Sequence, residues 1–410
     1  MPALLPIISL VLILASSVSK ADDNQTLLFA KIAERLSLMK AVAADKWLTS
    51  KAIEDKNREA IVLQQSRYTG LEMGITVASN EGFYRAQISA AKSIQRYWFR
   101  YWRDHSGPRS ADNLVNVIRP RLTSLGEDII SLLRTPVTQQ HRALFLEQTQ
   151  IEGLTRPSQE AIFEQLLALE YYPDRLTQVL DSGILRVGTT GDYAPFSESH
   201  LVDHYTGIDI DLAHNLADSL GVKVNLVTTS WPSLITDLSN NHFDIAMSGI
   251  SRTLQRQQHG FFSKAYHTGG KTPIIRCTDR RRLQSLSDID QTGNRIIVNP
   301  GGTNELYLDA NIKQAEKILF ADNRVIFNEI INGRADVMIT DAIEVTLQSN
   351  KHPELCPAMP GETLTYQEKA ILMHQDTILL NYIDLWLDLR QSDGTLQDIF
   401  DQHLNRNDPN

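Results

Sequence analysis

The hydrophobic period of the chain changes once, near Tyr172-Pro173. Before this point apolar residues recur at three- and four-residue spacing, as from Leu27 to Met39, which is typical of helices buried along one face. After it, short runs rich in β-branched residues alternate with helical patterns. A chain of 410 residues also exceeds what a single hydrophobic core supports. We therefore expect two folded units, over residues 22–172 and 174–404, with 405–410 as a tail.

The first of these units is expected to be all-helical, with about six helices, because its breaks each carry a capping residue or a proline. The breaks are expected near Thr49-Ser50, Asn80-Glu81, Ser106-Gly107-Pro108, Thr135-Pro136 and Thr155-Arg156-Pro157.

The second unit is expected to be α/β with mostly parallel strands. The strands are expected at residues 184–187, 223–227, 243–247, 272–275, 295–298 and 337–339. Glycine and turn residues follow two of them, in Gly188 to Asp192 and Asn299 to Asn304. Because ligands of open parallel sheets bind outside the carboxyl ends of the strands, we expect the binding site there.

The chain begins with an apolar run from Leu4 to Ala15, followed by small residues up to Ala21. This pattern predicts a signal peptide over residues 1–21 and a mature protein in the periplasm or outside the cell. A retained membrane anchor is the alternative, although the run is shorter than the roughly 20 residues of a membrane span. No membrane association is expected after cleavage, and the net charge of −9 argues against nucleic acid as a partner.

Two cysteines, Cys277 and Cys356, are the only ones in the sequence. In an oxidising compartment an even pair predicts a disulfide, with two buried free thiols as the alternative.

Several motifs of the second unit occur in a characteristic order. They are Thr229-Ser230-Trp231-Pro232, Phe243 to Ser251, Gly270-Lys271-Thr272-Pro273, Val298 to Glu305, Thr340-Asp341-Ala342-Ile343-Glu344 and Pro353 to Cys356. Together they resemble the periplasmic cyclohexadienyl dehydratases of the solute-binding-protein type, which act on prephenate or arogenate. The resemblance implies a two-lobed fold, with one lobe at about 174–269 and 366–404 and the other at about 270–365.

The ligand is expected to carry carboxylates. Arg256 follows the strand-end turn that contains Ser248 and Ser251, where it can bind a carboxylate with two hydrogen bonds; the alternative is a surface arginine. Gly302 and Thr303 open a helix whose backbone N–H groups suit a second anion, or they form a plain tight turn.

Loss of CO2 and water from prephenate requires a proton on the departing hydroxyl, and the resemblance places this general acid at Glu344. Asp341 is expected to cap the helix that carries Glu344. A helix N-terminus lowers a carboxyl pKa, so burial must outweigh it for Glu344 to hold a proton. Further candidates are hydrogen-bonding Lys271 and Asn299, and aromatic residues that wall the substrate ring, or simply fill the core: Tyr193, Phe196 and Trp231.

The first unit also shows a resemblance. Ala33-Glu34-Arg35-Leu36, Ala43 to Trp47 and Ile53 to Glu59 resemble the first two helices and joining loop of the secreted, gamma-class chorismate mutases. That resemblance implies that Arg35, Lys46 and Arg58 bind the dianionic substrate chorismate. Asp55 and Glu59 are expected to orient Arg58 or to bond a substrate hydroxyl.

Gln95 stands where that family carries a glutamate or glutamine that bonds the breaking ether oxygen, and an amide can donate this bond at any pH. One turn earlier the family often has Thr or Ser, whereas this sequence has Ala91. A further cation is expected on the fourth helix, with Arg121 favoured and Arg119 as the alternative.

The sequence predicts a bifunctional enzyme that makes phenylpyruvate from chorismate without a cofactor. The rearrangement needs only a compact substrate conformer and charge stabilisation, and the spacings of the histidines fit no zinc site. Secreted mutases of this type suggest a homodimer. Two alternatives stay open: an amino-acid-binding protein with a helical docking domain, and a helical half without catalytic activity.

Overall fold

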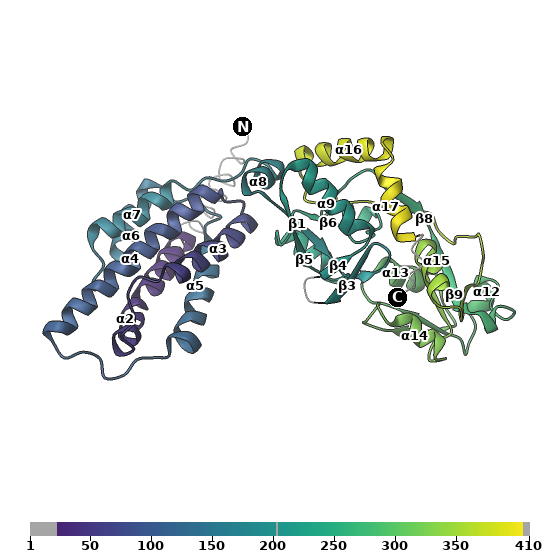
Figure 1. Ribbon diagram of the computed structural model, residues 1–410, viewed down its shortest axis with the longest axis horizontal. Helices are drawn as coiled ribbons and strands as arrows, with labels where there is room; N and C mark the ends of the chain where they lie inside the picture. The colour runs from purple at the N-terminus through teal and green to yellow at the C-terminus, as the bar shows by residue number, and fades with distance from the viewer. Residues whose placement is uncertain (1–22, 202–203, 405–410) are drawn as a thin grey trace, which may run out of the picture. The chain divides into compact units, whose positions relative to one another are not determined.

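The computed structural model describes residues 23–201 and 204–404, and these residues form two compact units that meet between Pro173 and Asp174 (Figure 1). The expected signal peptide and the tail at 405–410 lie outside the described residues. Among the helices of the described ranges, none combines the length and the apolar character that crossing a membrane requires.

The first unit is built from helices that lie side by side (Figure 1). They are a helix over 23–37, α2 (Met39–Leu48), α3 (Lys56–Glu72), α4 (Val77–Asp104), α5 (Arg119–Leu132), α6 (Arg142–Gln148) and α7 (Arg156–Leu167), with the short turns η1 (Leu114–Ile118) and η2 (Gln139–His141). Helix α4 is central, because it packs against α2, α3 and α7. Fully buried Phe29, Phe83, Ile94 and Phe163 belong to the core of this unit.

Local sequence explains most of the helix ends. The side chains of Asp55, Thr76 and Thr155 accept hydrogen bonds from backbone N–H groups at the starts of α3, α4 and α7. The break expected at Asn80-Glu81 was wrong, because the chain turns earlier, at left-handed Gly74. Asn80 instead lies inside α4, where its buried amide donates to the backbone oxygen of Ser66 (2.8 Å).

The second unit has two lobes, each with a five-stranded sheet, which confirms the expected two-lobed α/β fold. The first sheet has the order β5-β1-β6-β15-β7 and the second the order β11-β10-β12-β9-β13. The first lobe contains α8 (Arg175–Ser182), β1 (Ile184–Thr189), β2 (Asp192–Tyr193), β3 (Ser197–Leu201), β4 (His204–Thr206), α9 (Ile208–Leu220), β5 (Lys223–Thr228), α10 (Leu234–Ser239), β6 (Ile245–Ala246), α11 (Leu254–Gln257), β7 (Phe261–Phe262), β15 (Leu372–Met373), α16 (Thr377–Ser392) and α17 (Thr395–Leu404).

The second lobe contains β9 (Lys271–Arg276), η3 (Cys277–Asp279), α12 (Leu286–Ile289), β10 (Arg295–Val298), α13 (Thr303–Asn311), β11 (Glu316–Leu319), α14 (Ile326–Ile331), β12 (Val337–Asp341), α15 (Ala342–Lys351) and β13 (Leu355–Pro357). Between the lobes in sequence, β8 (His267–Gly269) pairs with β14 (Gln367–Lys369) in a two-stranded ribbon.

The central strands of both sheets run parallel, since β1 pairs with β5 and β6, and β10 with β11 and β12. Strand β9 was expected among the mostly parallel strands, but it runs antiparallel to β12. The chain enters the second lobe along β9 directly from the ribbon, without the crossover helix that a parallel neighbour requires.

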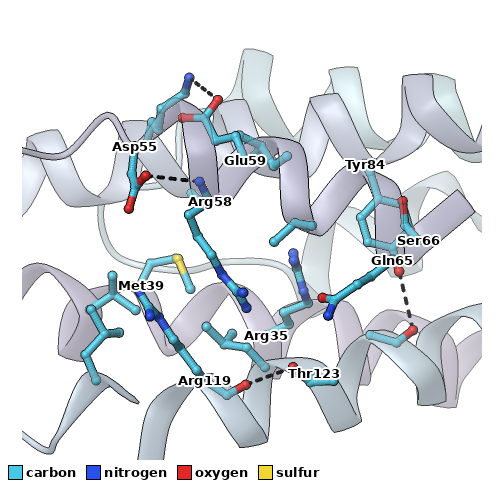
Figure 2. A pocket seen from close by; sticks show the side chains of 18 of the residues that line it. Arg35, Met39, Asp55, Arg58, Glu59, Gln65, Ser66, Tyr84, Arg119 and Thr123 are labelled. Carbon is cyan, nitrogen blue, oxygen red and sulfur yellow. Dashed lines mark hydrogen bonds and ion pairs between the residues drawn. The ribbon is translucent and has the colours of Figure 1, made fainter. Parts of the chain in front are cut away.

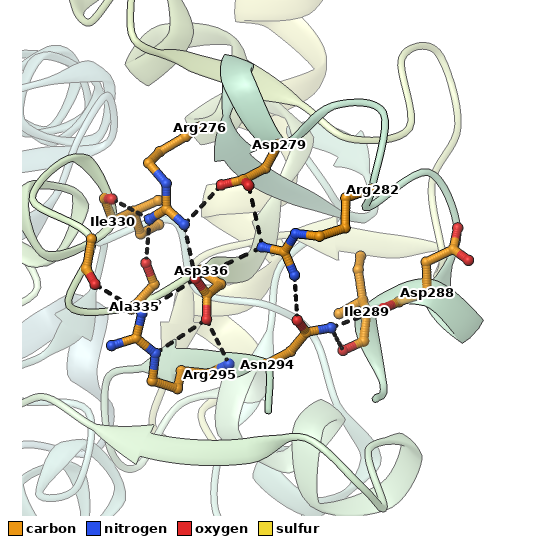
Figure 3. Close-up of polar contacts among 11 residues, drawn as sticks. Arg276, Asp279, Arg282, Asp288, Ile289, Asn294, Arg295, Ile330, Ala335 and Asp336 are labelled. Carbon is orange, nitrogen blue, oxygen red and sulfur yellow. Dashed lines mark hydrogen bonds and ion pairs between the residues drawn. The ribbon is translucent and has the colours of Figure 1, made fainter. Parts of the chain in front are cut away.

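Each lobe holds one aspartate that binds an arginine of the neighbouring strand in the same way. In the first lobe, Asp244 accepts from the backbone N–H of Arg186 (2.8 Å) and from its guanidinium (2.6 Å). In the second, Asp336 accepts from the backbone N–H of Arg295 (3.0 Å) and from its Nε (3.1 Å). Figure 3 shows this second cluster, in which Arg276 also reaches Asp336 (2.8 Å). In the first lobe this pair holds β1 against β6, and in the second lobe it holds β10 against β12.

Cys277 and Cys356, the expected disulfide, are bonded to each other in the second lobe. They join the start of η3 to strand β13, which is hydrogen-bonded to β9.

Candidate functional sites

The helical unit encloses a cavity of about 400 Å³ between α2, α3, α4 and α5. Its wall is largely apolar, with Met39, Val62 and Leu122 among its side chains. Five cationic residues also line it: Arg35, Lys46, Arg58, Lys92 and Arg119. Figure 2 shows the guanidinium groups of Arg35, Arg58 and Arg119 directed into this space. The cavity therefore combines an apolar wall with a concentration of positive charge.

Arg35 is the most deeply buried cation of the cavity, with 9% of its surface exposed. Its Nη1 donates to Oε1 of buried Gln87 (2.9 Å), and its guanidinium lies 5.8 Å from the ring centre of Tyr84. Burial lowers the pKa of Arg35, since no carboxylate in the described residues pairs with it. A buried cation without a counter-ion favours an anionic ligand.

Lys46 and Arg58 lie on either side of the loop between α2 and α3. Lys46 Nζ donates to the backbone oxygen of Ile53 (2.6 Å), and Asp55 accepts from the backbone N–H of Arg58 (3.0 Å). Burial lowers the pKa of both cations, and for Arg58 the charge of Arg119 adds to the effect. Within the described chain neither makes an ion pair, so both charges remain available to a ligand.

Gln95 reaches the cavity from α4 and is almost fully buried. Its Nε2 bonds to the backbone oxygen of Ala91 (3.3 Å), while its Oε1 has no hydrogen-bond partner. Rotation about the last side-chain bond exchanges the two ends of the amide, so Gln95 can offer a ligand either an acceptor or a donor. Ala91 lines the cavity as well.

The fourth-helix cation of the cavity is Arg119, and the preference for Arg121 was wrong. Arg121 is half exposed and pairs with Glu34, its Nε lying 3.0 Å from Oε1, whereas Arg119 lines the cavity. The π-helical turn η1 directly precedes α5 and shifts the angular position of its first residues, which spacing alone did not reveal.

Lys92 also lines the cavity and was not anticipated. It pairs with Glu59 (3.1 Å) and Glu54 (3.6 Å), so Glu59 is occupied by Lys92 and does not orient Arg58 as expected. Lys92 precedes Gln95 by three residues on α4 and therefore shares its helix face, which is the signal that could have identified it. The catalytic roles of the cavity residues stay predictions.

The second candidate site lies at the carboxyl ends of the strands, between the two lobes, and only about 20 Å³ of it is open. The lining contains eight of the expected residues: Tyr193, Trp231, Ser251, Arg256, Asn299, Gly302, Thr303 and Asp341. It also contains four that sequence reasoning missed: Gly249, Asn304, Asn323 and Lys369. The cleft is closed, because side chains from both lobes meet in it.

Four expected residues do not line the remaining space. Phe196 packs behind Tyr193, with ring centres 5.3 Å apart, and Ser248 bonds to the hydroxyl of Thr190 (2.7 Å). Lys271 lies one layer deeper and donates to Thr303 (3.2 Å). Glu344, the fourth of these residues, also lies outside the lining of the cleft.

Arg256 is buried, so the alternative of a surface arginine was wrong. Its Nη1 donates to the backbone oxygen of Ser251 (3.1 Å), and its guanidinium lies 5.9 Å from the ring centre of Trp231. Burial lowers the pKa of Arg256 to about 10, which leaves it charged at neutral pH. Because no carboxylate of the described residues pairs with it, Arg256 is suited to bind a ligand carboxylate.

Asp341 occupies the N-cap position of α15, but its carboxylate does not cap the helix as expected. It accepts instead from Tyr193 and from Lys369 Nζ (2.5 Å), and Lys271 Nζ lies 3.5 Å from its other oxygen. Burial would raise the pKa of Asp341, but the two ammonium groups hold it well below its ordinary value. Asp341 is therefore ionised and already paired.

Glu344 lies in the first turn of α15 with 2% of its surface exposed. Burial, followed by the charges of Asp341 and Asp192, raises its pKa to about 8 despite a hydrogen bond from Thr340. Burial thus outweighs the helix N-terminus, as a proton donor requires. Thr340 also accepts from cleft-lining Asn304 (3.1 Å), so hydrogen bonds connect Glu344 to the cleft.

Comparison with known proteins assigns the second unit. Residues 185–406, more than half of the chain, match the bacterial extracellular solute-binding proteins, family 3. The cyclohexadienyl dehydratase of Pseudomonas aeruginosa is 48% identical over 230 residues, which cover 56% of this chain and 86% of that protein. The L-cystine-binding protein TcyJ of Escherichia coli is 25% identical over 54% of this chain and 83% of its own length.

Among solved structures, the ancestral amino-acid-binding protein AncCDT-1, described as a precursor of cyclohexadienyl dehydratase, is similar to this chain with a TM-score of 0.53 and 32% identity. The similarity covers 56% of this chain and 99% of that protein. With the family match, the closed two-lobed cleft and a 48% identical relative in agreement, the chain belongs to the bacterial extracellular solute-binding proteins, family 3.

Proposed function

We propose that the protein is an exported bifunctional enzyme of phenylalanine synthesis. Its helical domain, residues 22–172, rearranges chorismate to prephenate. Its two-lobed domain, residues 174–404, converts prephenate or arogenate to phenylpyruvate or phenylalanine with loss of CO2 and water. The observation that carries the proposal is Glu344, a buried carboxyl whose pKa of about 8 keeps it protonated beside a cleft that holds an unpaired arginine.

In the two-lobed domain, Arg256 binds one carboxylate of the substrate. The bond between the ring and its carboxylate breaks to release CO2, and its electron pair enters the ring, which becomes aromatic. The bond between the ring and its hydroxyl breaks at the same time, and Glu344 supplies the proton that lets the oxygen leave as water. Glu344 then recovers a proton from solvent.

The 48% identical relative from Pseudomonas aeruginosa, a cyclohexadienyl dehydratase, supports this assignment. A solute-binding protein needs no buried proton donor, whereas this reaction does.

In the helical domain, the cavity of about 400 Å³ has room for a substrate the size of chorismate. Arg35, Lys46, Arg58 and Arg119 are cations without ion pairs in the described residues, and chorismate is a dianion. Gln95, which lines this cavity, bonds the ether oxygen as charge develops on it. The rearrangement needs no nucleophile, so binding the compact conformer and stabilising that charge are sufficient.

The second candidate function is amino-acid binding by the two-lobed domain, with the helical domain as a docking module. The L-cystine-binding relative and the ancestral amino-acid-binding protein favour it. In that case Glu344 would have no chemical role, so the two functions differ in what its replacement does.

The test is to incubate the purified protein with chorismate and to measure phenylpyruvate by its absorbance in alkali. We expect phenylpyruvate to form without added enzymes. Glu344→Gln should stop at prephenate, while Glu329→Gln, which removes a surface partner of Arg334, should behave as wild type. A wild-type protein that consumes neither chorismate nor prephenate would refute the proposal.

A further inference from the structure

We propose that Gln87 is a positioning residue of the helical cavity: it holds the guanidinium of Arg35 by a hydrogen bond and, because it is neutral, leaves the charge of Arg35 to a ligand carboxylate. The inference rests on the proposed function, in which the ligand is chorismate. It adds that substrate binding requires a neutral side chain at position 87, and not only a hydrogen-bond acceptor.

Gln87 lies on α4, and its side chain has no exposed surface. Its Oε1 accepts from Arg35 Nη1 (2.9 Å), which joins α4 to the first helix of the unit. Arg35 lines the cavity and its guanidinium is directed into it (Figure 2), whereas Gln87 is not among the lining side chains. Gln87 therefore acts on a ligand only through Arg35.

The second group that contacts the guanidinium of Arg35 is also neutral. The ring centre of Tyr84 lies 5.8 Å from this guanidinium. Burial raises the pKa of Tyr84 to about 12, so its phenol stays uncharged at neutral pH. Gln87 and Tyr84 thus orient Arg35 without neutralising it.

Three carboxylates line the cavity, and none of them pairs with Arg35 in the described chain. Asp55 caps α3, and Glu59 pairs with Lys92 (3.1 Å). Glu127 is exposed on α5. Burial accordingly lowers the pKa of Arg35, with no carboxylate to raise it again.

This arrangement costs stability. A buried cation without a counter-ion is unfavourable, and Nε2 of Gln87 has no hydrogen-bond partner in the described residues. A glutamate at position 87 would remove both costs, because it has no N–H group and would pair with Arg35. It would also occupy the cation that a ligand carboxylate needs. Stability and anion binding therefore favour different side chains at this position.

The experiment measures kcat/KM for chorismate in the full chain and in two variants. Gln87→Met removes the bond to Arg35 but leaves its charge free, and should lower kcat/KM about tenfold. Gln87→Glu keeps the bond but neutralises the charge, and should lower kcat/KM at least about 100-fold, mainly through KM. If only the hydrogen bond mattered, Gln87→Glu would be the more active variant, and that order would overturn the inference.

Thermal unfolding separates this role from a purely structural one. Gln87→Glu should melt at the temperature of wild type or above it, because it supplies a counter-ion to a cation that is already buried. A melting temperature that falls together with kcat/KM would overturn the inference. Gln64→Glu is the matched control, since it makes the same change of charge at an exposed position of α3 outside the cavity lining. It should change kcat/KM by less than about twofold.

Failure of the proposed function gives a different result. If wild type does not rearrange chorismate, the mutase activity is refuted, and equilibrium dialysis with chorismate decides the role of Gln87. Gln87→Glu should then bind chorismate at least about tenfold more weakly than Gln87→Met does. The cleft of the two-lobed domain is the same in both variants, so the difference reports the helical cavity. Equal binding by the two variants, or no binding by wild type, overturns the inference.

Discussion

Asp341 and Glu344 lie three residues apart at the start of α15, both nearly fully buried, and their pKa values move in opposite directions. Asp341 faces two lysines, which keep it ionised. Burial and then the charge of nearby Asp341 raise the pKa of Glu344 and keep it protonated, although Thr340 donates a hydrogen bond to it. The two carboxyls lie within one turn of helix but differ in charge at neutral pH: Asp341 is an anion, and Glu344 is a proton donor.

Dehydration should slow as the pH rises through about 8. Glu344 must be protonated to donate, and its pKa of about 8 means that the active form predominates below this value and is lost above it. The measurement is kcat for prephenate between about pH 6 and pH 10. Glu344→Gln should lower kcat by about 10² to 10⁴ and remove the decline. A wild-type rate that climbs through this range would contradict the role of Glu344.

The same carboxyl should make the two-lobed domain less stable as the pH rises. Its pKa is about 8 in the folded protein and 4.5 ordinarily. Between these values the unfolded chain releases the proton while the folded chain retains it, so the free energy of unfolding falls across this window. Glu344→Gln should therefore raise the melting temperature of the domain near pH 8 more than at pH 4.5, as thermal unfolding at both values can show. An equal shift at both would contradict this linkage.

The site residues of the helical unit came from a resemblance to a known family, and the fold explains why they come together. Arg35, Lys46, Arg58 and Gln95 line one cavity because they lie on neighbouring helices. Lys369 could not be found this way, since it reaches Asp341 only through the pairing of β14 with β8, which leaves no periodic pattern. The pKa of Glu344 shows the same limit, because one of the charges that raise it, that of Asp192, comes from the other lobe.

Replacing Arg119 and Arg121 one at a time should show which of the two arginines binds chorismate. Arg119→Ala removes a cation of the cavity and should lower kcat/KM for chorismate by about 10- to 100-fold, the value of a charge-assisted hydrogen bond. Arg121→Ala removes only a half-exposed ion pair with Glu34 and should change kcat/KM by less than about twofold. Steady-state kinetics with chorismate distinguish the two variants. A larger loss of kcat/KM in Arg121→Ala than in Arg119→Ala would show that Arg121, and not Arg119, binds the substrate.

The mutase rate should not depend on pH near neutrality, because the group proposed to bond the ether oxygen is the amide of Gln95. An amide donates without first taking up a proton. Gln95→Glu should introduce a decline in kcat with rising pH, since a carboxyl donates only while protonated, and Gln95→Ala should lower kcat at every pH. The measurement is chorismate consumption between about pH 5 and pH 8, with Gln159→Glu for comparison, because Gln159 is a buried glutamine of α7 that does not line the cavity. A wild-type rate that falls steeply from mildly acidic to neutral pH would show that another, titrating group bonds the ether oxygen.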